Sequence, residues 1–280
     1  MRKNISKSHF TSYLILIIIG FIMIFPMIYL VLGAFKSNQE ILSNASIIPQ
    51  KLSLDGFVNG WTSTGGNTFL TYLLNTMKLV LPTVLFTMIS STLVAYGFAR
   101  FNFFGKKQLF ILLISTLMLP NAVLLVPRYL IFRNFNWLDT YMPFIIPAAF
   151  ATFPFFVFMM VQFIRSIPTE LDEAAQIDGC NSFMILWRII LPVCKPALFS
   201  VGIFQFVWTW NDFFNALIYI SSVDKFTIQL ALRMTLDIAS QTNWNQIMAM
   251  SLISILPPII LFFTAQKYFV EGISTSGLKG

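Results

Sequence analysis

Histidine and cysteine are nearly absent from this chain, and their scarcity excludes several kinds of chemistry. The only histidine is His9, so neither a histidine general base nor a histidine-rich metal site is expected. The two cysteines, Cys180 and Cys194, match no metal-binding spacing and are too few for a disulfide framework. The sequence also contains no G-x-x-x-x-G-K-[ST] phosphate-binding motif and no H-E-x-x-H motif. We therefore expect no catalytic residues, no metal and no cofactor.

Charged residues are scarce as well, at 10% of the 280 residues against about 25% in a typical soluble domain. Hydrophobic residues make up 57% of the chain, and the mean hydropathy is +0.77. A soluble protein of this length could not bury so much apolar surface, so a lipid bilayer must solvate much of it. The high pI of about 9.5 does not indicate nucleic-acid binding, because the basic residues lie between apolar runs, where they set membrane orientation.

Six apolar runs are long enough to cross a bilayer, which takes about 20 residues. They cover residues 10–35, 72–99, 108–127, 140–164 and 196–220, and a last run from about residue 248 to 266. A lipid-exposed backbone must satisfy its own hydrogen bonds, so all six are predicted to be helices. The first run has no small-residue cleavage site, which favours an uncleaved span over a signal peptide. The predicted fold class is all-α: a polytopic membrane protein with one domain over residues 1–280.

The distribution of lysine and arginine predicts that both termini are cytoplasmic. With that orientation, cytoplasmic segments contain eleven basic residues: Arg2, Lys3, Lys7, Arg100, Lys106, Lys107, Arg165, Arg188, Lys195, Lys267 and Lys279. External segments contain six: Lys36, Lys51, Arg128, Arg133, Lys225 and Arg233. This excess follows the positive-inside rule. Lys78 lies within the second run, and we expect its side chain to reach the outer interface.

The predicted cytoplasmic segment 165–196 differs in composition from the rest of the chain. It contains four of the eleven acidic residues: Glu170, Asp172, Glu173 and Asp178. The sequence predicts a short acidic helix, a turn at Gly179, and a second helix capped by Asn181 or Ser182 that stops at Pro192. An apolar face is expected on the second helix, formed by Phe183, Leu186, Trp187 and Ile190. The acids favour docking of a soluble partner over lying on the lipid, because the cytoplasmic leaflet is negatively charged.

Seven positions of this segment resemble the signature loop of permease subunits of ATP-binding cassette (ABC) importers. That family's pattern is E-A-A, three residues, G, nine residues, I-x-L-P, and it is matched here by Glu173, Ala174, Ala175, Gly179, Ile189, Leu191 and Pro192. The resemblance implies that the loop couples the chain to a cytoplasmic ATPase, with Glu173 as an acceptor at the contact. Cys180 stands where alanine or another small residue is more usual, although cysteine is still small.

Two further stretches resemble the carbohydrate branch of these permeases, specifically the smaller subunit of maltose-type transporters. One is the predicted cytoplasmic tail 267–280, which contains Phe269-Val270-Glu271-Gly272-Ile273 and Gly277-Leu278-Lys279-Gly280. The other is Trp210-Asn211-Asp212-Phe213-Phe214 in the fifth run. Trp208, Trp210, Asn211 and Asp212 combine aromatic faces with polar groups, as sugar sites do, although the tryptophans also suit an interfacial belt. An acid within a span is a functional candidate, and whether Asp212 lines the pathway or pairs with a partner stays open.

The resemblance implies the MetI-like permease fold, transport by alternating access, and no enzymatic activity of the chain itself. It implies these partners: a second permease subunit in a heterodimer, two copies of a cytoplasmic ATP-binding subunit, and an extracellular solute-binding protein. A permease for amino acids, peptides or ions is the alternative, and only the tail and residues 210–214 argue against it. An ion-coupled secondary transporter is less favoured, because no internal repeat is visible and Asp212 is nearly the only acid within a span.

The two cysteines test the predicted orientation, because both lie in segment 165–196. A membrane-impermeant thiol reagent is expected to label Cys180 and Cys194 in inside-out vesicles and to spare both in intact cells. Mass spectrometry of the peptides locates the label. Equal labelling from the outside would contradict the six-span topology.

Overall fold

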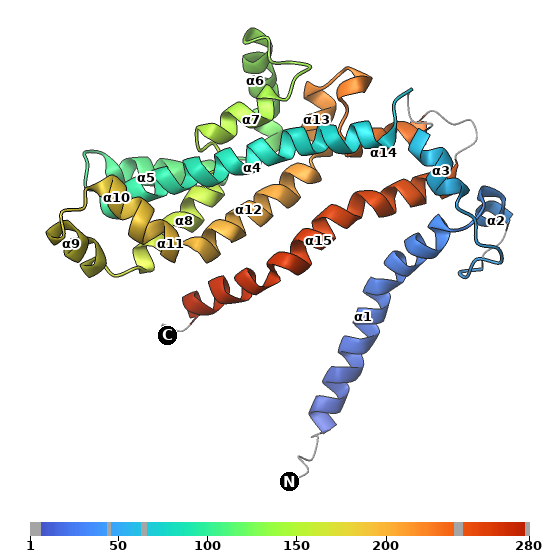
Figure 1. Cartoon of the computed structure of the whole chain (residues 1–280), viewed down its shortest axis with the longest axis horizontal. Coiled ribbons are helices and arrows are strands. Elements are labelled where there is room, and N and C mark those ends of the chain that lie inside the picture. Colours follow the sequence, from blue (N-terminus) through green and yellow to red (C-terminus); the bar gives the residue numbers. More distant parts are fainter. Residues whose placement is uncertain (1–6, 44–45, 63–65, 238–242, 278–280) are drawn as a thin grey trace. The chain divides into compact units, whose positions relative to one another are not determined.

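The computed structural model describes residues 7–43, 46–62, 66–237 and 243–277, and every regular element within these ranges is a helix (Figure 1). This confirms the predicted all-α class. The chain divides into two compact units. Unit 1 comprises Met1–Thr71 and Ala231–Leu256, and unit 2 comprises Tyr72–Leu230 and Pro257–Gly280. The assignment of residues 1–280 to one membrane domain stays a prediction.

Unit 1 is formed by α1 (Lys7–Ala34), α2 (Asn38–Ser43), α3 (Asp55–Thr62) and the first part of α15 (Trp244–Gly277). The Asn38 side chain accepts a hydrogen bond from the Trp244 backbone N–H at 2.9 Å, which ties α2 to the start of α15. Gly56 packs on the backbone of Asn245 so closely that a Cβ would lie 2.6 Å from the Asn245 carbonyl oxygen. Most apolar side chains of α1 between Tyr13 and Val31 are exposed, as expected for a helix that lipid solvates.

Unit 2 contains most of the helices. They are α4 (Phe69–Arg100), α5 (Lys106–Thr116), α6 (Asn121–Asn134), α7 (Met142–Ala149), α8 (Pro154–Ser166), α9 (Glu170–Ile177), α10 (Ser182–Ile185), a π-helical turn (Leu186–Ile190), α11 (Leu191–Val193), α12 (Lys195–Trp210), α13 (Phe213–Tyr219) and a 3₁₀ turn (Val223–Lys225). The chain passes from unit 2 to unit 1 within α14 (Ile228–Asp237), at Ala231. The core of this unit lies where α4, α8, α10 and α12 meet, with Phe156, Met160 and Ile190 fully buried. Within it, α9 and α10 lie at the C-terminal end of α4, whereas α13 lies toward its other end (Figure 1).

The loops after α6 and α13 are joined through Asp139. Its carboxylate accepts hydrogen bonds from the backbone N–H groups of Ser221 and Ser222, at 3.0 and 2.8 Å, and forms an ion pair with Lys225 at 2.7 Å. Burial opposes ionisation of Asp139, but the hydrogen bonds from Lys225 and Ser222 outweigh it and hold the pKa of Asp139 well below its usual range. The carboxylate therefore stays charged across the neutral pH range, and the connection between the two loops persists with it.

Four helical segments are long and apolar enough to cross a membrane: Ser12–Ala34, Phe69–Arg100, Met142–Ser166 and Trp244–Ala265. Two further helix pairs qualify only when each is taken together, and both are bent. Lys106–Thr116 and Asn121–Asn134 meet at 103°, and Ser182–Val193 and Lys195–Trp210 meet at 76°. The described residues therefore contain four to six candidate spans, and each predicted run overlaps one of them.

Three predicted runs are not single helices. The fourth, residues 140–164, is divided into α7 and α8 by a break at residues 150–153. The third, residues 108–127, breaks before Pro120, because proline disfavours the helical conformation at the residue before it. The fifth, residues 196–220, ends its first helix at Trp210, and Asp212 then caps a separate helix, α13. In all three cases the apolar pattern located the run but not the break.

The cysteines differ in accessibility. Both are free thiols, but Cys194 is fully buried, whereas Cys180 is partly exposed. The expected labelling of Cys194 is therefore wrong for the folded chain, and Cys180 alone reports the orientation. Of the predicted tail, Leu278, Lys279 and Gly280 lie outside the described residues, as do the side chains from Gln266 onward.

Candidate functional site

The segment that carries the ABC-importer pattern folds into two short helices separated by a glycine turn. α9 has three acids in its first turn, Glu170, Asp172 and Glu173, where the helix dipole favours negative charge. Gly179 has φ of +83°, the left-handed conformation that a helix C-cap favours. Asn181 then caps α10, because its side-chain oxygen accepts a hydrogen bond from the Met184 N–H at 2.8 Å. The predicted turn and the predicted cap are both confirmed.

A buried ion pair fixes this segment to α4. Arg100 Nε lies 2.6 Å from Asp172 Oδ2, and the two side chains are only 7% and 12% exposed. The Arg100 guanidinium also donates to the Ile167 carbonyl at 2.9 Å. One turn earlier on α4, the Tyr96 hydroxyl donates to the Ser182 carbonyl at 3.0 Å. The last turns of α4 thus hold the start of both short helices.

The residues that match the ABC-importer pattern divide between surface and core. Glu173, Ala174 and Pro192 are exposed, whereas Ala175 is 5% exposed and belongs to the buried core of unit 2. Ile189 and Leu191 are partly buried and pack against that core. Glu173 and Ala174 are therefore available to a partner, while the more buried residues of the pattern fix the segment in place.

The predicted apolar face of the second helix is divided. Leu186 and Ile190 are buried in the core, but Phe183 and Trp187 are 65% and 58% exposed, with ring centroids 6.0 Å apart. Ile177, at the end of α9, is 87% exposed. We call Glu173, Ile177, Phe183 and Trp187 the docking residues. Exposed aromatic side chains of this kind are typical of protein–protein contacts.

The predicted stop at Pro192 is confirmed to within one residue. The helix continues to Val193, and the turn before the proline, Leu186–Ile190, is π-helical. Proline has no N–H and its ring clashes with the carbonyl four residues earlier in a regular α-helix. A π turn shifts the hydrogen-bond register and accommodates the proline. The chain then changes direction by 76° before α12.

A second feature of unit 2 is a cavity of about 680 Å³, lined by residues from α4, α5, α6, α7, α8, α12 and α13 and from the breaks between these helices. Trp208 and Asp212, two of the four residues predicted to lie along a substrate pathway, line this cavity. Trp210 does not, because it is 1% exposed and stacks on Phe206 with ring centroids 5.4 Å apart. Asn211 is exposed, and its side chain donates to the Val207 carbonyl at the end of α12. The structure therefore brings together half of the predicted set.

The cavity combines aromatic faces with polar groups. Trp208 packs against Phe155 in its wall, with ring centroids 5.4 Å apart. Gln205 Nε2 donates to Thr209 at 2.7 Å, but Gln205 Oε1 is buried and has no hydrogen-bond partner in the part of the chain that the structure describes. An unsatisfied buried oxygen is costly unless a ligand or water donates to it. Asp212 accepts hydrogen bonds from the backbone and side chain of Asn215.

Sequence analysis missed most of the polar lining: Asn121, Arg128, Gln205, Thr209 and Asn215. Arg128 was counted only as an orientation signal. A usable signal was present in the fifth run, because Gln205, Thr209 and Asp212 are spaced by four and three residues within an apolar stretch. That spacing places polar side chains on one face of a helix.

Known proteins resemble the chain over nearly its whole length. The sequence model of the family described as "Binding-protein-dependent transport system inner membrane component" matches residues 89–275. The probable ABC transporter permease protein YurM of Bacillus subtilis (strain 168) is 36% identical over 256 residues, covering 91% of this chain and 84% of that protein. The arabinooligosaccharides transport system permease protein AraQ of the same organism is 32% identical over 279 residues, covering 97% of this chain and 98% of that protein.

Among solved structures, a chain of a bacterial ABC transporter involved in the import of the acidic polysaccharide alginate matches with a TM-score of 0.85. The match covers 96% of this chain and 99% of that chain. At 22% sequence identity, this likeness shows the fold alone.

Replacing Asp172 by Asn is expected to loosen α9, because it leaves the Arg100 charge buried without a countercharge, at a cost of about 3–5 kcal/mol. Limited proteolysis of the purified protein should then cleave residues 165–182 faster. Glu170→Gln, which removes an exposed charge from the same helix, is the matched control and should change little. The double variant Arg100→Met/Asp172→Leu should recover most of the protection, because it removes both buried charges. Unchanged cleavage in Asp172→Asn would show that the ion pair does not hold the segment.

Proposed function

We propose that this chain, which belongs to the family of binding-protein-dependent transport system inner membrane components, is a permease subunit of an ATP-driven importer of a sugar or oligosaccharide. The observation that carries the assignment to sugars is the cavity of about 680 Å³, with its aromatic wall and polar groups. This volume falls within the range of about 300–1,000 Å³ that ligand sites occupy. The similarity to a permease for arabinooligosaccharides supports the same substrate class.

The cavity groups match the surface of a sugar. A pyranose presents an apolar C–H face that packs on an aromatic ring, as Trp208 offers, and hydroxyl groups that both donate and accept hydrogen bonds. Gln205 Oε1 and the Asp212 carboxylate accept from such hydroxyls, and Arg128 donates to them. Transport by alternating access requires such a site to face each side of the membrane in turn, with ATP hydrolysis in a separate subunit driving the change.

The docking residues form the contact with that ATPase. Glu173 provides a carboxylate for charge-assisted hydrogen bonds, and Phe183 and Trp187 provide apolar area. Gly179 sets the angle between α9 and α10. Because Arg100 and Tyr96 fix the segment to α4, displacement of the docking residues moves a membrane helix with them.

Residues 165–196, which carry the docking residues and are called the docking segment, also indicate the composition of the complex. One chain offers one such segment among its described residues, whereas closure of an ATP sandwich needs two ATPase copies. We therefore infer a heterodimer with a second permease subunit, two ATP-binding subunits on the cytoplasmic side, and an extracellular binding protein that delivers the sugar. Both termini and the docking segment lie in the cytoplasm in this arrangement, as the positive-inside rule requires.

The sugar pathway is tested with the purified complex, its binding protein and a panel of sugars and amino acids. A sugar is expected to stimulate ATP hydrolysis, and Trp208→Ala should raise its half-saturating concentration about five- to tenfold, because an aromatic contact contributes about 1 kcal/mol. Trp210→Ala is the contrasting variant: it opens a cavity in the core and should lower abundance instead. Stimulation by amino acids alone would assign the chain to the alternative class.

Coupling is tested at α9 and at the turn. Glu173→Ala should weaken retention of the ATPase about tenfold or more, because it removes charge-assisted hydrogen bonds. Glu170→Ala, an exposed acid on the same helix, is its control. Gly179→Leu should abolish sugar-stimulated hydrolysis, because leucine at φ of +83° is strained by about 1–2 kcal/mol and misdirects α10. Gly179→Asn should be mild, since asparagine tolerates this conformation and no atom lies within 4 Å of a Cβ there. Normal coupling in Gly179→Leu would disprove the role of the turn.

A further inference from the structure

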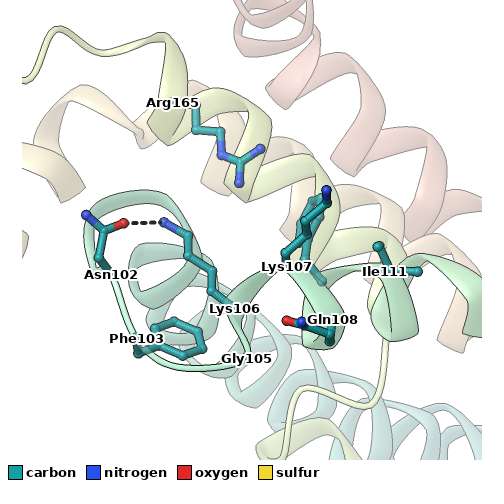
Figure 2. Close-up of a pocket in the computed structure, with 9 residues that line it drawn as sticks. Asn102, Phe103, Gly105, Lys106, Lys107, Gln108, Ile111 and Arg165 are labelled. Atoms are coloured by element: carbon teal, nitrogen blue, oxygen red, sulfur yellow. Dashed lines mark hydrogen bonds between the residues drawn. The ribbon is translucent and has the colours of Figure 1, made fainter.

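A basic pocket lies apart from both the sugar cavity and the docking residues. Its volume is about 610 Å³, and it is formed by the loop after α4, the start of α5 and the end of α8 (Figure 2). Three cations line it: Lys106 and Lys107 at the start of α5, and Arg165 in the last turn of α8. We call this site the basic pocket.

The three cations are held differently. The Lys106 ammonium donates to the Phe101 carbonyl at 2.7 Å and approaches Asn102 Oδ1 at 3.4 Å, which closes the loop. The Arg165 guanidinium lies 5.0 Å from the centre of the Phe110 ring, a cation–π arrangement that fixes it in place. Figure 2 shows Arg165 entering from α8 and the two lysines from the start of α5. Lys107 and Arg165 are both exposed.

No carboxylate balances this charge. The two ion pairs found among the described residues join Arg100 to Asp172 and Lys225 to Asp139, and no acidic residue lines the pocket. Arg100 is therefore occupied elsewhere, and the three cations of the basic pocket lack an anionic partner within the described part of the chain. Three clustered positive charges repel one another, so an anion bound among them is stabilising.

The surface next to the basic pocket is apolar. α5 has no buried residue, and Leu109, Ile111 and Leu112 are 49%, 55% and 62% exposed. Phe104, in the loop, is fully exposed. A ligand that satisfies both surfaces must carry an anionic head and an apolar body.

We propose that the basic pocket binds the phosphate of an anionic phospholipid, with the acyl chains lying along α5. The pocket then faces the cytoplasmic leaflet, which is rich in anionic lipids, and this placement rests on the orientation given under the proposed function. Arg165 offers a planar fork that can bind two phosphate oxygens, and Lys107 adds a mobile charge. Because the loop that forms one side of the pocket follows Arg100 directly in the chain, the lipid sits near the end of α4.

The test uses the full complex in phosphatidylcholine nanodiscs containing a photoactivatable phosphatidylglycerol. Crosslinks are expected on residues 101–116 and 154–166, and unlabelled phosphatidylglycerol should compete them away. In Lys107→Gln/Arg165→Gln the competing lipid should bind about 25-fold more weakly, since each cation near an anionic surface contributes roughly a factor of five. Lys51→Gln/Arg133→Gln removes two exposed cations elsewhere and should leave crosslinking unchanged. Arg165→Lys keeps the charge but loses the planar fork, so it should weaken binding less than Arg165→Gln does.

Three results would overturn the proposal. Equal losses in the two double variants would mean that the lipid senses only the overall charge. Competition by millimolar inorganic phosphate would make the pocket a site for free phosphate. Loss of ATPase retention in Lys107→Gln/Arg165→Gln, with lipid crosslinking unchanged, would assign the pocket to a protein partner. None of these readouts depends on sugar transport, so failure of the lipid site and failure of the proposed function are separable.

Discussion

The buried ion pair between Arg100 and Asp172 is the interaction on which the docking segment depends. α9 is short and buries only Asp172 and Ala175, so little apolar contact holds it in place. The arginine also donates to the Ile167 carbonyl, whereas Asp172 Oδ1 is buried and has no hydrogen-bond partner among the described residues. Removing either partner would leave the other charge buried alone, which is the costly case for such a pair. With the pair in place, exposed residues of α9 such as Glu173 are held in a fixed position relative to α4.

Local features of this segment were predictable from sequence, and distant ones were not. Gly179 and Asn181 were assigned correctly because a left-handed turn and a helix cap need particular residues at particular places. Nothing local pairs Arg100 with Asp172, since eighteen basic and eleven acidic residues allow many combinations. The π turn before Pro192 also escaped prediction, because its register is decided by the packing of Leu186 and Ile190 in the core.

The breaks in the apolar runs have a common location. Helices are interrupted at residues 117–120, 150–153 and 211–212, and residues from all three breaks line the cavity of about 680 Å³. Irregular backbone at membrane depth is tolerated where it borders a cavity instead of lipid. Asp212 is an example. Hydropathy placed it within a span, but in the structure it caps α13, which starts at the cavity wall. The apolar composition of the sequence predicts where the spans lie, whereas the breaks within the spans lie at the cavity.

α4 acts mechanically as a rod that is held at both ends. Near its start, Asn75 donates to the carbonyls of Asp224 and Phe226, and at its end Arg100 and Tyr96 grip the docking segment. The 25 residues between Asn75 and Arg100 span about 37 Å at 1.5 Å per residue. A tilt of about 5° at one end therefore displaces the other by roughly 3 Å, enough to break a hydrogen bond. The contacts at Asn75 and those at Tyr96 and Arg100 are thus joined by one helix, so a movement at one end need not pass through a chain of side-chain contacts to reach the other.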